Sequence, residues 1–448
     1  MKKPEVKLLS EKIVLVGGGG REDALARRLF EDGAELISIM PNSNPSIRSI
    51  SSETLVTKSM DVDLIARFII EKKPDLAYVS PDGYLATHLV DRLEYNKIKV
   101  ASPSSASFQI ESSKIFMRQL MKRYGIPGNL KYEVLDNEYD VQKILSTETM
   151  EFAIKPSGLT GGKGVKITDQ HFNNRKEAIR YAKDILLRDK KVLIEEAVYG
   201  EEFSMQLFTD GVNSIFAPIA QDYKRLYEND IGPNTGGMGS ITDVELKLPF
   251  MRAGIYERAK DISKRFVEAL FQDGLMFRGV LYVQFMQTKD DLKVIEVNGR
   301  LADPEGMNII TLMEGSPVDL LFRIADADLK SAKITFKRKA SVLKYLVPKG
   351  YGDSPNPGIL RINTGDIPNH VHIFYSSVEG DLNEVRMSNS RAIAIMSEAD
   401  SIPDASNMVE MNLWRIEGDY FMRHDIGNAE SMHRKNENAR TGNYKTTH

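Results

Sequence analysis

Residues Phe152 to Ile167 read FAIKPSGLTGGKGVKI: a short apolar run, a glycine-rich turn and a second short run. This pattern predicts two antiparallel strands, 152–156 and 165–167, joined by the loop 157–164. The amides of such a loop can fold over phosphate groups while its lysines supply positive charge. It is not a Walker A loop, because Gly164 stands where that motif requires Ser or Thr. Taken alone, the segment favours a flexible hairpin with solvated lysines over a phosphate-binding flap.

The segments on either side add polar groups. Ser112 or Ser113 predicts the N-cap of a helix from Lys114 to Tyr124. Residues 192–198 predict a buried strand that ends in acids, and Glu201-Glu202 begins another strand. Carboxylates at such strand ends suit recognition of hydroxyl groups, as on a ribose, although a solvated strand edge would look the same.

A second glycine-rich segment, GPNTGGMG at 232–239, follows Gln221-Asp222-Tyr223-Lys224-Arg225. Four glycines in eight residues argue against a helix or a regular strand. A loop so poor in side chains lets a ligand approach the backbone, and Lys224 and Arg225 favour a phosphate or carboxylate ligand. The alternative is a long structural turn.

Two further strands, 280–286 and 293–298, carry oxygen donors. Glu296 and Asn298 share one strand face, and a turn near Asp290 places Gln284 opposite Glu296. Carboxylate and amide oxygens suit Mg²⁺, and a buried, hydrogen-bonded Glu–Asn pair is the alternative. Arg300 follows at once, placed either to bind an anionic substrate group or to form an ion pair with Asp303; both can hold.

The first hundred residues alternate apolar runs with helical patterns, which predicts a parallel sheet flanked by helices. Its glycine turn, Gly17 to Gly20, does not fit a dinucleotide site. Glu22 replaces the third glycine, and no acidic residue follows the apolar run 36–40. A turn for a small phosphorylated ligand and a turn without ligand remain open.

Length and composition set limits. The 448 residues suggest about three domains, and a net charge of −3 excludes nucleic-acid binding through bulk charge. Without cysteine, a thiolate metal site, a Cys nucleophile and a disulfide framework are excluded. No apolar run is long enough for a membrane span and no signal segment is visible, so we expect a cytoplasmic protein. Short strand-like runs after residue 336 predict a small α+β domain, and the polar residues 429–448 predict a disordered tail.

Together these motifs occur in the order of an ATP-grasp ligase, and they resemble one family, the glycinamide ribonucleotide synthetases (phosphoribosylamine–glycine ligases). The resemblance covers about residues 12–428. It rests on GGREDAL at 19–25, SSKIF at 112–116, Lys155 to Gly164, Gln221 to Arg225, Gly232 to Gly239, Glu296 to Glu305, and Arg423 to Gly427. It implies an α/β fold with three domains: a parallel-sheet pre-ATP-grasp domain at 12–110, an ATP-grasp domain at 111–335 with a flap subdomain at about 131–199, and a C-terminal α+β domain at 336–428.

The resemblance also implies an activity: ATP-dependent ligation of glycine to 5-phosphoribosylamine through glycyl phosphate, in purine biosynthesis, by a monomer or homodimer. The alternatives are an ATP-grasp ligase with another acceptor and an inactive nucleotide-binding regulator. The implied catalytic residues are Lys155, Lys163 and Arg300. The implied nucleotide site comprises Lys114, Lys155, Lys163, Gly164, Glu195, Val198 and Glu202, and the implied Mg²⁺ or Mn²⁺ ligands are Gln284, Glu296 and Asn298. The implied substrate site comprises Gly19, Gly20, Asp222, Lys224, Arg225, Gly236, Gly237, Met238, Gly239, Arg300 and Asp303.

Three positions depart from the family pattern. Asp23 replaces a histidine, Ser80 to Leu85 replaces G-P-E-x-P-L, and Gly306 replaces a threonine. All lie near the expected acceptor sites, so they bear on the second substrate and not on ATP.

Overall fold

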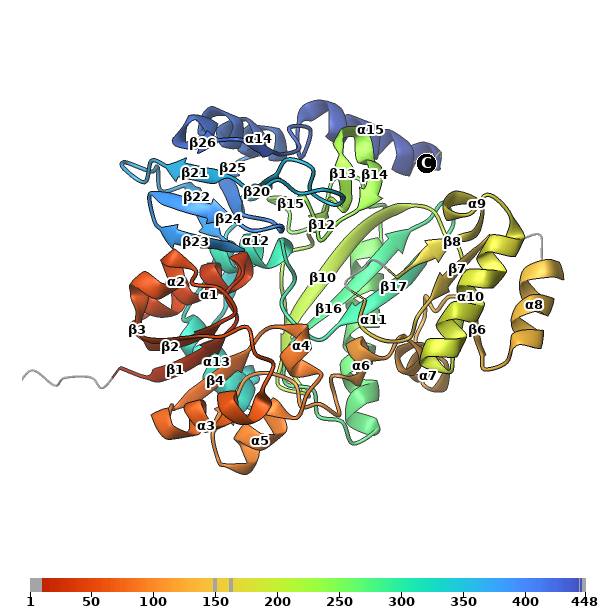
Figure 1. Ribbon diagram of the computed structural model, residues 1–448, viewed down its shortest axis with the longest axis horizontal. Coiled ribbons are helices and arrows are strands. Elements are labelled where there is room, and N and C mark those ends of the chain that lie inside the picture. The colour runs from red at the N-terminus through yellow and green to blue at the C-terminus, as the bar shows by residue number, and fades with distance from the viewer. Residues whose placement is uncertain (1–9, 148–150, 161–163, 443, 445–448) are drawn as a thin grey trace, which may run out of the picture.

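The computed structural model of the protein describes residues 10–147, 151–160, 164–442 and 444. Figure 1 shows the N-terminal α/β layer, the flap with helix α10 and the C-terminal sheets above, with the long strands β10, β16 and β17 between them. Within the described ranges, no helix combines the length and apolar character needed to cross a bilayer.

The N-terminal part is the expected parallel sheet. Its strand order is β3-β2-β1-β4-β5 and every pairing is parallel. Side chains alternate along β1, so that Ile13 and Leu15 enter one buried cluster while Val14 and Val16 enter another, as a sheet covered on both faces requires. The strands are β1 Lys12–Val16, β2 Glu35–Met40, β3 Ser51–Val56, β4 Leu76–Val79 and β5 Lys99–Val100, and the helices are α1 Gly20–Glu31, α2 Pro45–Ile50, α3 Val62–Lys72, α4 Asp82–Leu85 and α5 Leu89–Tyr95.

The flap is a four-stranded antiparallel sheet in the order β6-β9-β7-β8, covered by two helices. It contains both strands predicted beside the first glycine loop. The sequence prediction of a helix beginning after Ser113 is also confirmed, because the Ser113 side chain accepts from the Phe116 amide at the start of α7. The elements here are α6 Gln109–Ser112, α7 Lys114–Arg123, β6 Tyr132–Leu135, α8 Glu138–Thr147, β7 Phe152–Lys155, β8 Lys166–Ile167, α9 Thr168–His171, α10 Arg175–Asp189 and β9 Val192–Glu196.

A second antiparallel sheet, β11-β10-β16-β17, faces the flap and packs on the long amphipathic helix α11. Its long strands are almost wholly buried, which explains their apolar sequences. These elements are β10 Glu201–Thr209, β11 Ser214–Phe216, α11 Ile255–Gln272, β16 Gly279–Gln287 and β17 Leu292–Asn298, followed by α12 Glu305–Leu312, the short pair β18 Met313–Glu314 and β19 Thr335–Phe336, and α13 Pro317–Ala325.

The C-terminal part is built on a sheet that also takes strands from the middle of the chain. Its order is β12-β15-β20-β25-β22, with β15 paired to β20 through Gly239 and Lys344. The segments around the second glycine loop are thus fixed to the C-terminal sheet. The strands are β12 Gln221–Asp222, β15 Gly239–Thr242, β20 Ala340–Pro348, β22 Val371–Tyr375, β25 Ile393–Ala399 and β27 Tyr420–Phe421, beside β21 Ile359–Ile362, β23 Val378–Asp381, β24 Glu384–Met387, β26 Ile416–Gly418 and α14 Ile402–Met411.

The expected disordered tail is a helix over most of its length, α15 Ala429–Thr441. Asn428 caps it by accepting from the Ser431 amide at 2.7 Å, and Met432 is buried. Lys435 is buried as well, with its Nζ 3.4 Å from Glu201 and 3.5 Å from Asp230. The prediction from composition was wrong because this helix docks through buried ion pairs, which a count of apolar residues does not detect.

Candidate active site

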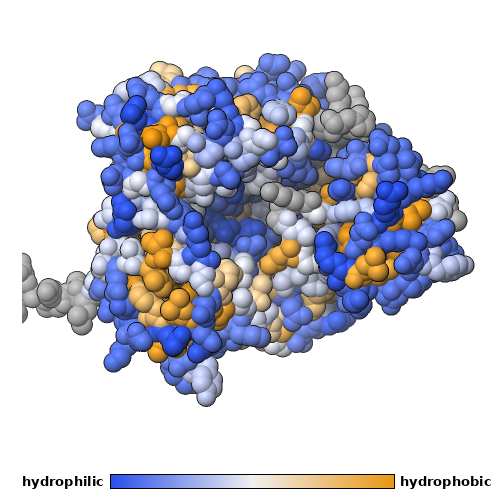
Figure 2. Space-filling model, in the orientation of Figure 1, coloured by the Kyte–Doolittle hydropathy of each residue, from blue (hydrophilic) through white to orange (hydrophobic). Residues whose placement is uncertain are grey.

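A cavity of about 670 Å³ lies where the flap, the β10–β16–β17 sheet and α15 meet. Figure 2 shows the molecule hollowed at its centre, with hydrophilic side chains inside the hollow. Among the residues named from the sequence, those that line the cavity are Lys114, Lys155, Val198, Glu202, Asp222, Lys224, Arg225, Gly236, Glu296, Asn298, Arg300 and Asp303.

Two of the predicted phosphate-binding lysines lie on this wall. Lys114 begins α7, and its Nζ donates to the Gly158 carbonyl at 2.9 Å, which joins the helix to the flap loop. Burial lowers the pKa of Lys114, and the charge of Glu296 opposes that shift. Lys155 ends strand β7 with its side chain 8% exposed. Lys163 lies outside the described residues, and Gly164 lies at the loop's far end, where its carbonyl accepts from the Tyr181 hydroxyl.

The resemblance implied that Glu195 belongs to the nucleotide site, but Glu195 does not line the cavity. It is 1% exposed, and its carboxylate lies 2.6 Å from both Arg118 Nε and Lys155 Nζ. Burial opposes ionisation of Glu195, but these two cations outweigh it and lower the pKa to about 2. Because side chains alternate along β9, it is Glu196 that faces the cavity, followed by Ala197 and Val198.

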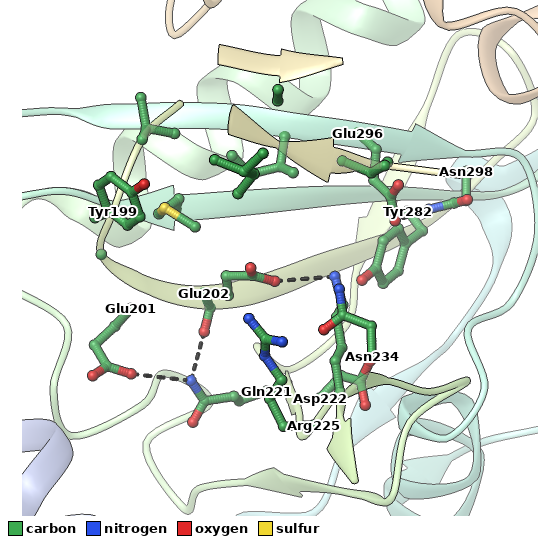
Figure 3. A pocket seen from close by; sticks show the side chains of 18 of the residues that line it. Tyr199, Glu201, Glu202, Gln221, Asp222, Arg225, Asn234, Tyr282, Glu296 and Asn298 are labelled. Atoms are coloured by element: carbon green, nitrogen blue, oxygen red, sulfur yellow. Dashed lines mark hydrogen bonds and ion pairs between the residues drawn. The ribbon is translucent and has the colours of Figure 1, made fainter. Parts of the chain in front are cut away.

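The predicted geometry of the metal strands is confirmed. Gln284 pairs with Glu296 across β16 and β17, and Asn298 Nδ2 lies 3.5 Å from Glu296 Oε1 on the same face. Figure 3 shows Glu296 and Asn298 beside Tyr282, with Glu202 and Asp222 in the same pocket. Burial opposes ionisation of Glu296, but Lys224, Lys114 and Lys155 outweigh it and lower the pKa. Glu296 is therefore an ionised carboxylate, and it lines the cavity.

The donor set fits a magnesium-type ion with few protein ligands. Among the described residues, no three His, Asp or Glu side chains converge to hold a metal. Glu296 and Asn298 supply oxygens at the cavity surface, and such a site completes its shell with substrate phosphates. Gln284 is already engaged: it donates to Glu202 at 2.8 Å and accepts from the Tyr282 hydroxyl. Gln284 is also buried and, unlike Glu296 and Asn298, does not line the cavity.

Glu202, the expected ribose residue, lies beside Lys224. The Lys224 Nζ donates to Glu202 Oε2 at 3.0 Å. Burial would lower the pKa of Lys224, but Glu202, Glu296 and Asp222 outweigh burial and raise it. Lys224 is therefore a fixed cation between the expected metal strand and the second glycine loop.

The second glycine loop divides into a cavity part and a structural part. In the loop, Asn234, Thr235 and Gly236 line the cavity, as do Asp222 and Arg225 in the segment before it. Met238 is fully buried, and a methyl group on Gly239 would lie 2.2 Å from the Leu343 carbonyl oxygen, so both residues serve the packing of β15 on β20. Part of the segment is a strand after all, since β14 Ile231–Asn234 pairs with β13 Arg225–Tyr227. The structural alternative therefore holds for Met238 and Gly239.

Arg300 and Asp303 both face the cavity, but they have different partners. Arg300 Nη2 lies 3.3 Å from Glu111, while Asp303 Oδ1 lies 3.3 Å from Arg391 and accepts from the Tyr345 hydroxyl at 2.8 Å. The structural alternative of an Arg300–Asp303 ion pair is therefore wrong. Glu111 leaves Arg300 21% exposed and able to meet an anionic group.

The N-terminal glycine turn lies next to Asp303 and outside the lining of the cavity. The Gly19 amide donates to Glu22 Oε2 at 2.7 Å, so a side chain of the same helix already caps it. A methyl group on Gly19 would lie 3.7 Å from Asp303 Oδ2. Asp23, at the position of the family histidine, accepts from the Tyr375 amide at 2.8 Å and pairs with Arg27. It ties the N-terminal part to the C-terminal sheet.

Several cavity residues were not singled out from the sequence. One of them is Glu305, which acts on the predicted residue Asp222: burial, followed by the charge of Glu305, raises the pKa of Asp222 well above its usual range, and Lys224 opposes this. Glu305 is itself buried and accepts from the Ser204 hydroxyl at 3.1 Å. Tyr282 pairs with Asn298 across β16 and β17, so the predicted strand pairing could have indicated it. No local pattern in the sequence marks the residues of α15. The other lining residues that were not singled out include Glu111, Arg434, Lys435, Glu437 and Asn438.

Comparisons with known proteins agree with this geometry. The family model described as phosphoribosylglycinamide synthetase, N domain, matches residues 11–111, and that of the ATP-grasp (A) domain matches residues 112–306. The chain is 38% identical over 426 residues to phosphoribosylamine–glycine ligase of Thermococcus kodakarensis, covering 95% of this chain and 97% of that protein. It is 39% identical over 427 residues to the ligase of Methanosarcina acetivorans, covering 95% and 96%.

Solved structures show the same fold. The phosphoribosylamine–glycine ligase of Thermotoga maritima superposes with a TM-score of 0.76 at 24% identity, covering 92% of this chain and 99% of that one. The biotin carboxylase domain of Hydrogenobacter thermophilus 2-oxoglutarate carboxylase, in complex with MgADP, ADP and bicarbonate, superposes with a TM-score of 0.72 at 16% identity, covering 98% and 96%.

Proposed function

The chain belongs to the phosphoribosylglycinamide synthetase family, and we propose that it ligates glycine to 5-phosphoribosylamine at the cost of ATP, forming glycinamide ribonucleotide, ADP and phosphate. One observation carries the proposal. A single cavity is lined both by the lysines and the Glu296–Asn298 strand expected for ATP and by Asp222, Arg300 and Asp303 expected for the acceptors.

On the nucleotide side, Lys114, Lys155 and Lys163 bind the phosphates, and Gly164 lets the loop close over them. Val198 lies against adenine and Glu202 holds the ribose. Glu195 acts through Lys155, because their ion pair fixes the lysine at the cavity wall. These assignments rest on family motifs and on the lining of the cavity.

Glu296 and Asn298 would hold Mg²⁺ or Mn²⁺, with Gln284 on the neighbouring strand as the third expected ligand. The bound ion would neutralise charge on the phosphoryl group being transferred. The protein contributes position and fixed charge: Lys155 is held by Glu195, and Lys224 is held by Glu202.

On the acceptor side, a carboxylate oxygen of glycine attacks the γ-phosphorus and ADP leaves. The amine of phosphoribosylamine then attacks the carbonyl carbon of glycyl phosphate, releasing phosphate and one proton. Arg300 and Lys224 bind the anionic groups, while Asp222 and Asp303 orient the amines. The acceptor-side set also includes Arg225, Gly236, Gly237, Met238 and Gly239, of which Met238 and Gly239 act only through packing. It includes Gly19, which adjoins Asp303, and Gly20, which adjoins the Tyr345 hydroxyl.

The test is ADP release measured with each substrate omitted in turn. We expect ADP release to require glycine, and sustained ligation to require phosphoribosylamine as well. Arg300→Ala should lower ligation by roughly 100-fold while ATP binding persists, because the fork of donors is lost. Arg338→Ala, at an exposed position, is the matched control. Equal ADP release with and without glycine would favour another acceptor or an idle ATPase.

We further propose a cytoplasmic enzyme that acts as a monomer or homodimer, without a nucleic-acid or membrane partner. The near-balanced charge of the chain supports this.

A further inference from the structure

Arg391 connects two loops that lie far from it in the sequence. It stands between β24 and β25, and its Nη1 donates to the carbonyls of Gly236, Gly237 at 3.3 Å and Asp303 at 3.2 Å. Its Nη2 lies 3.3 Å from Asp303 Oδ1. A single guanidinium from the C-terminal part therefore holds both loops that carry the proposed acceptor residues.

The guanidinium is itself held in place. Its Cζ lies 4.7 Å from the centroid of the Tyr345 ring, and the Tyr345 hydroxyl donates to Asp303 Oδ1 at 2.8 Å. The Arg391 side chain is 15% exposed. Burial would lower its pKa, but the charge of Asp303 and the other neighbours outweigh burial and raise it. Arg391 is thus a rigid, permanently charged fork, which suits several fixed acceptors at once.

Two glycines of the second glycine loop, Gly236 and Gly237, lie close to side chains on both sides of the loop. A methyl group on Gly236 would lie 3.2 Å from Arg391 Cζ. Gly237 has φ +102°, and a methyl group there would lie 2.5 Å from Asp222 Oδ1. Glycine is required at Gly237 by its φ and its contact with Asp222, while a side chain at Gly236 would push against the guanidinium. The position of Asp222 is therefore coupled to that of Arg391 through two residues without side chains.

We propose that Arg391 is a positioning residue of the acceptor site, which holds the loop at Gly236 and the Asp303 carboxylate in the geometry that glycine and 5-phosphoribosylamine require. The inference rests on the function proposed above. It is confined to the acceptor side, because the ATP-side residues are held by other contacts: Lys114 by Gly158, Lys155 by Glu195, and Glu296 by Asn298.

The experiment compares Arg391→Lys and Arg391→Met with the wild type, using the full chain. The KM values for glycine and phosphoribosylamine come from coupled ADP release, and the Kd of a non-hydrolysable ATP analogue comes from calorimetry. We expect at least one acceptor KM to rise by roughly tenfold or more in both variants, with the analogue Kd within about twofold. Lysine keeps the charge but replaces the rigid, planar fork of donors with a compact ammonium on a flexible stem. Arg386→Lys, on the exposed face of β24, should leave all these values unchanged.

Unchanged acceptor KM values in Arg391→Lys would overturn the proposal. So would a loss of analogue affinity equal to the loss for the acceptors, since that indicates a general structural role. If circular dichroism shows that Arg391→Met is unfolded, Arg391→Lys decides alone, because it keeps a cation beside Asp303. If the wild-type protein releases ADP without depending on glycine, the proposed function itself is refuted. The wild-type assay therefore tests the function, and only the variants test the role of Arg391.

Discussion

Lys155 Nζ lies 2.6 Å from Glu195 Oε2, below the cavity wall to which the lysine contributes. The same carboxylate accepts from Arg118 Nε at 2.6 Å, and both Glu195 and Arg118 are almost fully buried. A lysine expected to meet phosphate is thus already fixed by an acid that no ligand reaches. The ion pair therefore affects both the stability of the fold and the position of Lys155 in the site.

Glu195→Gln should destabilise the fold by about 3 kcal/mol at pH 7, because Arg118 and Lys155 lose their buried counter-charge. The pKa of Glu195 is lowered to about 2, so its contribution is fully present above its ordinary pKa near 4.5 and is lost as pH falls toward 2. Denaturant unfolding of variant and wild type across this range measures it. Glu133→Gln, exposed on β6, is the control. A difference that persists undiminished at pH 2 would contradict the role of this charge.

Glu296→Gln should lower turnover at limiting Mg²⁺ by roughly 100-fold while the free energy of unfolding changes by about 1 kcal/mol or less. The amide keeps the shape and the hydrogen bond near Asn298 but removes the ligand charge. Steady-state rates titrated with Mg²⁺, together with denaturant unfolding, separate the two effects. Glu417→Gln, exposed on β26, should change neither. Wild-type turnover at limiting Mg²⁺ would show that Glu296 is purely structural.

Hydrogen exchange in peptides covering 157–164 should slow when ATP binds. The two ends of this loop are held at Gly158 by Lys114 and at Gly164 by Tyr181, each at 2.9 Å, and bound phosphates would add contacts between these ends. Mass spectrometry with and without a non-hydrolysable analogue gives the readout. The β10–β11 turn at Gly211 should exchange at the same rate in both states. An unchanged loop would argue against its contact with nucleotide.

Lys435→Met should release α15 from the cavity wall. The change leaves Glu201 and Asp230 without their shared cation, at a cost of about 2 kcal/mol. We expect faster proteolysis after Asn428 and weaker binding of the ATP analogue, since α15 lines the cavity. Asn436→Ala, on the exposed face of the same helix, is the control. Equal protease sensitivity in both variants would mean that the helix is held by its apolar contacts alone.

Local patterns in the sequence predicted much of the fold. The alternation of apolar runs with helical patterns predicted the parallel sheet, including the run 36–40 that forms β2, and strand periodicity placed Glu296 and Asn298 on one face opposite Gln284. The edge strand β3 was missed because its side chains are polar and largely exposed, so they carry no apolar signal.

The sequence by itself determined many of the chemical groups in the site, because the lysines, the Glu296–Asn298 strand and the two glycine loops are each local motifs. Only the tertiary structure decided which of them reach the cavity. In the folded chain, Glu195 points inward to Lys155, Gly239 packs against Leu343, and Arg391 contacts Gly236, which lies 155 residues away in the sequence. Helix α15 docks through Lys435. The physical reason is that buried charges are stabilised by partners distant in sequence, and a local pattern cannot name those partners.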